Sequence, residues 1–435
     1  MSTISLISGP VPVLALAAGA AGLGWLVVKS RRYLVRVVPV ALIAAGGLTL
    51  VLVYVAENVF HWWDDTLPPI LYIPAGLTFL ALLLVVPRIR ARSGSRLVAV
   101  VAGVVSVVLV AVASASFVNV HFGQYPTLAS ALGDTGVSDQ PISSVAAGPN
   151  TPGTPATSQS TWTAPPNMPT GGTIYSVTIP GPVSGYASAP ALVYLPPAYL
   201  AAPKASNLPV LVLFHGLPGS PVDWVNGGQI AQVMDTFAAA HDGLAPVVII
   251  PDITNNGASD PPLCMDTKVS KSDTYLSVDL PAWVESTLGA GTASARQWAI
   301  AGYSYGGTCT MQLATNDSEV YPTFIDIAGE TEPTVEGGRS AVISTYFAGD
   351  ASAFTDQNAL DRLKSHSFPD SAGIVVVGAT DTTYRSQGQQ VFDVAHASGM
   401  DVTEQVLPGG HSWQVWKPGL VNNLDWLAQR MGLIK

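Results

Sequence analysis

Charged residues are scarce in this sequence of 435 residues, because only 11% are Asp, Glu, Lys or Arg. Soluble domains carry about 25%, so the composition argues against a chain that is soluble throughout. Basic residues are also few, with 19 Lys and Arg against 29 Asp and Glu. The resulting net charge of −10 argues against binding to nucleic acid, which needs a basic surface. The two cysteines are too few for a disulfide scaffold or a Cys-rich zinc site. We expect neither a metal nor a cofactor.

Apolar sequence is abundant near the N-terminus. Four runs without a charged residue each approach the roughly 20 residues that cross a bilayer as a helix: 11–28, 37–56, 70–86 and 97 to about 120. Residues 1–120 are therefore predicted to form a four-helix transmembrane region, with the small residues at 44–47 allowing close packing. Ionisable residues that would mark an ion path are missing from the runs. We expect an anchor, with a lipid-presenting or partner-binding role as the alternative.

The loops between these runs differ in charge. Basic residues occupy the first and third loops, and acidic residues the second: Lys29, Arg31, Arg32 and Arg36; Arg88, Arg90, Arg92 and Arg96; Glu57, Asp64 and Asp65. Loops rich in Lys and Arg stay in the cytoplasm. Both termini, and everything after the fourth run, are therefore predicted to be extracytoplasmic.

Residues 121–172 are predicted to be a linker. From about residue 134 they are rich in Pro, Ser, Thr, Gly and Ala. This composition does not bury a core of its own. An extended tether is therefore expected.

Residues 173–435 alternate between strand and helix patterns. Short apolar runs predict strands at 174–179, 191–195, 210–214, 246–250, 298–302, 323–327, 374–377 and 403–407. Helical patterns fall at 229–240, 275–288, 306–314, 387–398 and 421–431. Near-continuous Val, Ile and Leu strands separated by helices indicate an α/β domain, with a mainly parallel sheet covered on both faces.

The motif Gly302-Tyr-Ser-Tyr-Gly306 lies between a predicted strand and a predicted helix. That context is typical of the nucleophile elbow of α/β-hydrolases, in which the glycines permit a sharp turn that exposes the serine oxygen. We therefore expect Ser304 to be a nucleophile, with a Gly/Ser-rich turn as the alternative.

A serine hydroxyl needs a base, and in this fold the histidine comes last in the chain. Three histidines follow Ser304. His396 falls in a helical pattern and His366 in a polar stretch before a strand, whereas His411 follows the last strand on a glycine-rich loop. His411 is the predicted base.

The acid that orients the base should follow the end of a strand. Asp381 comes directly after the run at 374–377 and is the predicted acid. Glu330, which follows the strand at 323–327, is the runner-up. Asp350 is a weaker candidate for the acid, because it leads into a helix. The alternative for Asp381 is that it is a solvated surface residue without a catalytic role.

Two backbone N–H groups should stabilise the developing oxyanion. One belongs to the residue after the nucleophile, Tyr305, and the Leu217 amide after the strand at 210–214 is the second candidate. His215 stands in the wrong place in the chain for the base, and we expect it to order this loop.

Cys264 and Cys309 are the only cysteines. On the predicted orientation both lie outside the membrane, where disulfides persist. Because Cys309 follows the elbow and Cys264 lies in the loop after the strand at 246–250, a disulfide between them is expected, with two buried thiols as the alternative.

Three motifs together resemble the esterase family of α/β-hydrolases, which includes esterase-D-like enzymes, feruloyl-esterase-like enzymes and mycolyltransferases. They are His215-Gly-Leu-Pro-Gly-Ser, Gly302-Tyr-Ser-Tyr-Gly-Gly and Gly410-His-Ser-Trp-Gln-Val-Trp. The resemblance covers residues 173–435 and implies that Ser304 and His411 are nucleophile and base. It also supports the Leu217 and Tyr305 amides as the oxyanion hole. Four spans before such a domain resemble membrane esterases of actinobacteria.

These features predict a membrane-anchored, outward-facing serine esterase that acts on acyl esters of envelope or membrane lipids. Mycolyltransferases use a glutamate acid and are secreted, unlike this chain, so acyl transfer between glycolipids is the alternative activity. A non-catalytic envelope-assembly protein is the alternative of a different class. The expected partners are an ester substrate and the membrane, and the sequence identifies no protein partner.

Overall fold

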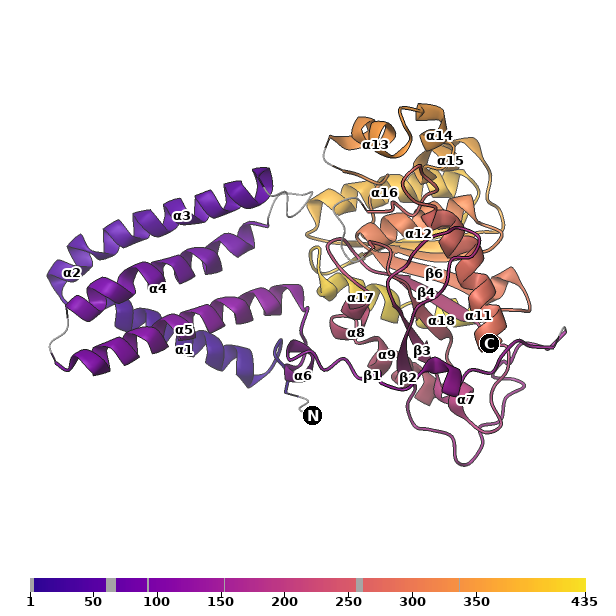
Figure 1. Cartoon of the computed structure of the whole chain (residues 1–435), viewed down its shortest axis with the longest axis horizontal. Coiled ribbons are helices and arrows are strands. Elements are labelled where there is room, and N and C mark those ends of the chain that lie inside the picture. Colours follow the sequence, from indigo (N-terminus) through magenta and orange to yellow (C-terminus); the bar gives the residue numbers. More distant parts are fainter. Residues whose placement is uncertain (1–3, 60–67, 92–93, 152, 256–260, 336) are drawn as a thin grey trace. The chain divides into compact units, whose positions relative to one another are not determined.

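The computed structural model describes residues 4–59, 68–91, 94–151, 153–255, 261–335 and 337–435. The chain divides into two compact units, residues 1–133 and 134–435, and each is described by itself (Figure 1). Asp64, Asp65 and Arg92, which carried part of the predicted orientation, lie outside the described residues.

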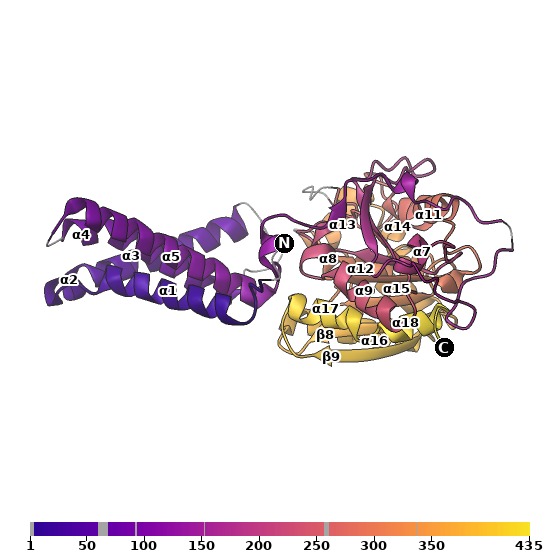
Figure 2. The same ribbon diagram turned by 90° about the horizontal axis from the view of Figure 1, so that it is seen from below.

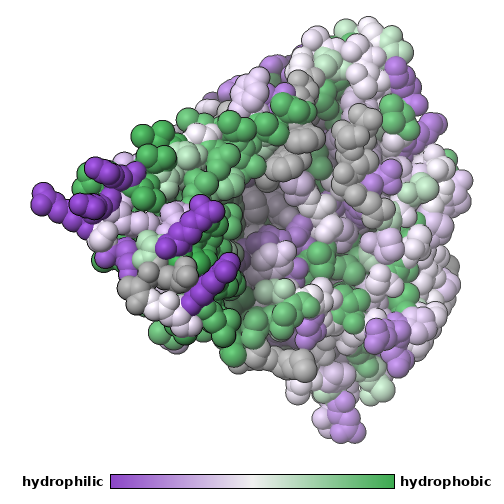
Figure 3. All heavy atoms as spheres, turned by 60° about the vertical axis from the view of Figure 1, so that its left-hand side comes forward, coloured by the Kyte–Doolittle hydropathy of each residue, from purple (hydrophilic) through white to green (hydrophobic). Residues whose placement is uncertain are grey.

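The first unit contains four helical segments that are long and apolar enough to cross a membrane. Its helices are α1 (Pro10–Val27), α2 (Arg31–Arg36), α3 (Val38–Asn58), α4 (Tyr72–Arg90), α5 (Arg96–Phe122) and α6 (Leu128–Ala131). Many of its large apolar side chains are exposed, as lipid-facing side chains would be. Figure 3 shows these hydrophobic side chains over the helices, and long hydrophilic ones at the end nearest the viewer.

Small residues bring α1 and α5 together. A Cβ placed on Gly19 would lie 2.3 Å from the Ala113 Cβ, and one on Gly22 would lie 2.9 Å from the Ser106 carbonyl oxygen. The expected packing role of residues 44–47 does not hold for Gly46 and Gly47, since a Cβ on either would meet no atom within 4 Å among the described residues. Small size permits close packing, but only a facing helix makes use of it.

The two ends of the first unit differ in character. The segments before α1 and after α5 pair at one end, where the Leu6 N–H donates to the Pro126 carbonyl (2.8 Å) and the Leu128 N–H to the Ile4 carbonyl (3.0 Å). The basic loops therefore lie at the opposite end. There the Arg88 guanidinium stacks over Trp25 and donates to its carbonyl oxygen at 2.7 Å, which joins α4 to α1.

The second unit is built on a nine-stranded sheet of order β1-β2-β3-β5-β4-β6-β7-β8-β9. The strands are β1 (Val137–Ser138), β2 (Thr173–Val177), β3 (Ala191–Leu195), β4 (Val210–Phe214), β5 (Val247–Ile250), β6 (Trp298–Tyr303), β7 (Thr323–Ile327), β8 (Ala372–Gly378) and β9 (Asp401–Leu407). Strand β3 is antiparallel to both of its neighbours, and all pairs from β5 to β9 are parallel. The predicted α/β fold is confirmed, and β3, β4 and β7 match their predicted bounds.

Helices flank this sheet (Figures 1 and 2). They are α7 (Pro197–Leu200), α8 (Val222–Asn226), α9 (Ile230–Ala240), α10 (Ser272–Thr274), α11 (Leu280–Leu288), α12 (Tyr305–Asn316), α13 (Gly338–Tyr346), α14 (Ala351–Thr355), α15 (Ala359–Ser365), α16 (Thr382–Ala397), α17 (Trp413–Val421) and α18 (Leu424–Arg430). A π-helical turn, Tyr275–Asp279, precedes α11.

Both faces of the sheet are covered, as the strand pattern predicted. Asp326 and Ile327 are neighbours in β7, so their side chains point to opposite faces. Helix α12 approaches the face of Asp326, because a Cβ on Gly307 would lie 2.4 Å from its Oδ1. Helix α17 approaches the other face, because a Cβ on Gly419 would lie 3.2 Å from the Ile327 Cγ2.

Residues 134–172 do not form the expected extended tether, because the described residues of this segment belong to the second unit and pack on its sheet domain. Strand β1 pairs with β2, and Ile142 is buried in the core of the sheet. The Trp162 indole N–H donates to the Asp242 carbonyl at 2.9 Å, and the Gln159 N–H to the Leu433 carbonyl at 2.8 Å. The segment lacks the composition for a core of its own, but isolated apolar side chains and backbone groups dock it on an existing core.

Candidate active site

Ser304 occupies the turn between β6 and α12. Its backbone angles, φ 56° and ψ −128°, are strained for a residue with a side chain. Glycine is required on both sides of this turn. A Cβ on Gly302 would lie 2.1 Å from the Gly306 carbonyl oxygen, and one on Gly306 would lie 2.4 Å from the Phe214 carbonyl oxygen. The strand, the sharp turn and the helix thus have the form of a nucleophile elbow.

His411 and Asp381 meet Ser304 at this turn. The His411 Nε2 lies 2.9 Å from the Ser304 Oγ, and its Nδ1 lies 2.8 Å from the Asp381 Oδ2. A carboxylate only accepts hydrogen bonds, so Nδ1 carries the proton and Nε2 is free to accept from the serine hydroxyl. The structure brings these three predicted residues together.

Asp381 caps the N-terminus of α16, directly after β8. Its Oδ1 accepts from the Tyr384 N–H at 3.3 Å while Oδ2 faces His411, and the residue is buried, at 7% exposure. The cap therefore fixes the direction in which the carboxylate points.

The alternative acids and bases have other contacts. Glu330 accepts from the Thr334 hydroxyl at 2.9 Å on each carboxylate oxygen, and Asp350 caps α14. His366 lies 2.9 Å from the Ser365 hydroxyl, and His396 stacks on Phe392 within α16.

The two predicted oxyanion-hole residues belong to backbone segments next to Ser304. Tyr305 is the first residue of α12, where backbone N–H groups have no partner within the helix. A Cβ on Gly216 would lie 3.3 Å from the Ser304 Cβ, so the backbone just before the Leu217 amide packs against the serine.

His215 ties this loop to the segment after β5. The Ile253 N–H donates to the imidazole Nε2 at 3.3 Å, so Nδ1 carries the proton and donates to the Gly216 carbonyl at 2.9 Å. Its side chain is fully buried, with the Asp252 carboxylate 3.4 Å from Nε2. This placement agrees with a role in ordering the loop.

Cys264 and Cys309 form a disulfide, with their Cα atoms 5.4 Å apart. Next to it, the Leu263 N–H donates to the Tyr305 hydroxyl at 2.9 Å. Burial raises the pKa of this phenol, which stays protonated. Both links join the loop after β5 to the start of α12.

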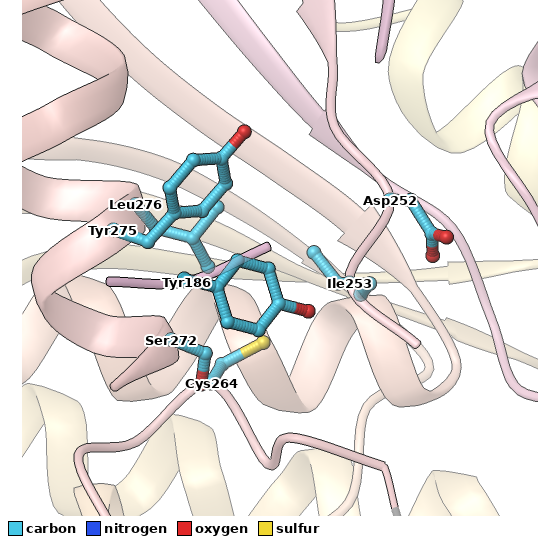
Figure 4. A pocket seen from close by; sticks show the side chains of 7 residues that line it. All are labelled: Tyr186, Asp252, Ile253, Cys264, Ser272, Tyr275 and Leu276. Carbon is cyan, nitrogen blue, oxygen red and sulfur yellow. The ribbon is translucent and has the colours of Figure 1, made fainter. Parts of the chain in front are cut away.

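A small pocket lies beside the disulfide (Figure 4). It is lined by Tyr186, Asp252, Ile253, Cys264, Ser272, Tyr275 and Leu276. The Tyr186 and Tyr275 rings are 4.9 Å apart, and the Tyr275 hydroxyl lies 2.9 Å from that of Ser188. Burial raises the pKa of Tyr275 to about 12.

Among the described residues, no group of three or more His, Cys, Asp or Glu side chains could hold a metal ion.

Two further residues at this site, Tyr384 and Asp326, are not predicted from the sequence. Tyr384 stacks on the His411 ring, and the only signal was its position three residues after Asp381. Asp326 lies beneath the elbow with no exposed surface, and burial raises the pKa of its carboxyl to about 7. An acidic residue inside an otherwise apolar strand was the available signal.

The family model with the description "Putative esterase" matches residues 187–427, more than half of the chain. The chain belongs to this esterase family. By this membership, the esterase is an enzyme, a serine ester hydrolase or acyltransferase.

Two solved structures share the fold of the esterase's second unit. A ferulic acid esterase is 18% identical with a TM-score of 0.51, and the match covers 61% of this chain and 100% of the other. The S-formylglutathione hydrolase of Agrobacterium tumefaciens has the same identity, TM-score and coverage of this chain, with 98% of the hydrolase covered.

An uncharacterized protein of Corynebacterium glutamicum is 34% identical to the esterase over 400 residues. The match covers 90% of this chain and 89% of that protein. Because the second unit spans only residues 134–435, a match of this extent must continue into the helical unit.

Proposed function

We propose that the chain is a membrane-anchored serine esterase whose catalytic unit faces outward and hydrolyses acyl esters of envelope or membrane lipids. The observation that carries the proposal is the continuous hydrogen-bonded chain from Asp381 through His411 to Ser304 at a strained elbow. A serine so placed needs only an ester carbonyl within reach to react.

The proposed reaction has two stages. His411 Nε2 takes the hydroxyl proton while the Ser304 Oγ bonds to the ester carbonyl carbon. The oxyanion is stabilised by the Tyr305 and Leu217 N–H groups, and His411 then returns the proton to the departing alcohol. Water, activated by the same imidazole, releases the acyl group as a carboxylic acid. Asp381 holds the tautomer and stabilises the imidazolium.

The proposed location rests on the helical unit. Its basic loops lie at the end opposite the segment that continues into the catalytic unit, and basic loops stay in the cytoplasm. A disulfide in the catalytic unit fits an oxidising, extracytoplasmic setting. A lipid substrate is proposed because a tether to the bilayer raises the effective concentration of enzyme at that surface.

Hydrolysis of a p-nitrophenyl ester by the full chain in detergent tests the proposal. His411→Ala should lower kcat by several orders of magnitude, whereas His366→Ala, a matched histidine outside the site, should not change it. An inactive wild-type protein that is folded would refute the proposal. Adding an acceptor alcohol to the assay distinguishes hydrolysis from the alternative activity, acyl transfer. An acyltransferase forms the new ester in preference to the free acid.

A further inference from the structure

The imidazole of His411 is held on a loop, not on a regular element. It follows Gly409 and Gly410, and Gly409 has a φ of 131°, which favours glycine. The hydrogen bonds of Nδ1 with Asp381 and of Nε2 with Ser304 hold two atoms of the ring and do not restrain its rotation about the line between them. Something else must therefore set the plane in which Nε2 faces Ser304.

Tyr384 lies flat against this ring. The centroids of the two rings are 3.8 Å apart, and their planes differ by 21°. Tyr384 is in the first turn of α16, the helix that Asp381 caps, and its N–H donates to the Asp381 Oδ1. One helical turn thus holds both the carboxylate that orients the imidazole and the aromatic face that covers it.

A second aromatic ring, that of Trp416, also contacts His411. The two rings are 5.1 Å apart and nearly perpendicular, at 87°. Trp416 in turn stacks on Tyr303, with centroids 4.3 Å apart and planes differing by 22°. Because Tyr303 precedes Ser304 in the elbow, this series of rings connects the plane of the imidazole to the position of the nucleophile.

We infer that Tyr384 is a positioning residue, whose ring fixes the plane of the His411 imidazole for proton transfer from Ser304. The inference rests on the proposed function. It concerns the ring and not the hydroxyl, because the ring makes the stack. A negative aromatic face also attracts the imidazolium that forms when His411 takes the proton.

The test compares three variants of the full chain in detergent. Tyr384→Leu should lower kcat for a p-nitrophenyl ester roughly 10- to 100-fold, as a small misplacement of a catalytic group does, with KM within about twofold. Tyr384→Phe should restore kcat to within about threefold of the wild type. The control is Phe392→Leu, because Phe392 lies in the same helix, eight residues after Tyr384, and stacks on His396. It should leave kcat unchanged.

Each outcome bears on one claim. A wild-type kcat in folded Tyr384→Leu would overturn the positioning role, and so would Tyr384→Phe behaving like Tyr384→Leu, since the hydroxyl would then carry the effect. If Tyr384→Leu does not fold, the Phe variant still decides, because a kcat as low as that of His411→Ala would contradict the role of the ring. Loss of activity in the wild type itself would refute the proposed function instead.

Discussion

Asp326→Asn is expected to remove a pH dependence from the stability of the catalytic unit. Asp326 lies in β7 with no exposed surface, and burial raises the pKa of its carboxyl from 3.8 to about 7. Oδ1 accepts from the Gly329 N–H at 3.0 Å, and Oδ2 has no hydrogen-bond partner within the described part of the chain. Asparagine keeps the acceptor for Gly329 and has nearly the same volume.

The direction follows from proton binding. Between pH 4 and 7 the folded state keeps a proton on Asp326 that the unfolded state has released, so stability falls as pH rises. A shift of about three pKa units lowers the free energy of unfolding of the wild type by about 4 kcal/mol at pH 8. With roughly 2.1 cal/mol/K of unfolding entropy per residue, a unit of this size should gain about 6 °C in Tm from Asp326→Asn at pH 8.

Thermal unfolding of the full chain in detergent, followed by tryptophan fluorescence, measures this effect. The variant and the wild type should melt at similar temperatures near pH 4 and diverge progressively toward pH 8. Glu330→Gln is the matched control, because that carboxylate is only half-buried and hydrogen-bonded to Thr334. If the Tm of Asp326→Asn and that of the wild type changed in parallel with pH, ionisation of Asp326 would not destabilise the fold, and the reasoning would be refuted.

Three further results are expected. Replacing both Cys264 and Cys309 with serine should cost about 4 kcal/mol, from the 45-residue loop that the disulfide closes, and reductant should lower the wild-type Tm to match. A protein of residues 134–435 should hydrolyse soluble esters at a rate within about tenfold of that of the full chain. Its Tm should be higher than that of a protein of residues 165–435, which lacks β1 and Ile142. A folded but inactive protein of residues 134–435 would contradict the separation of the units. A reporter active only in the cytoplasm should work after Arg36 and be silent at the C-terminus, and the reverse would overturn the orientation.

The sequence was informative where local chemistry decides the structure. Strands β3, β4 and β7 were predicted at their bounds because buried parallel strands are near-continuous apolar runs. Ser304 was predicted from a strand, a glycine-flanked serine and a helix in succession. His411 and Asp381 followed from chain order and from their places after the last two strands.

Features that depend on distant partners were not predictable. Helices α13 and α14 pack against Leu263 and Met265, which precede them by more than 70 residues, so their own sequence carries little periodic signal. Ile142 docks residues 134–172 on a core built by other strands. The stacking of Tyr384 on His411 requires that the first turn of α16 meet a loop 27 residues further along the chain, and no local pattern encodes that.

Labelling with a fluorophosphonate probe tests the central claim most directly, because the probe bonds only to a serine activated by a neighbouring base. Ser304→Ala is well suited to the test, since alanine keeps the Cβ and hence the backbone strain, and Ser365→Ala is its control. We expect the wild type and Ser365→Ala to carry the label on the peptide that contains Ser304, and Ser304→Ala, at an unchanged Tm, to carry none. A label on another residue, or undiminished labelling of folded Ser304→Ala, would contradict the account.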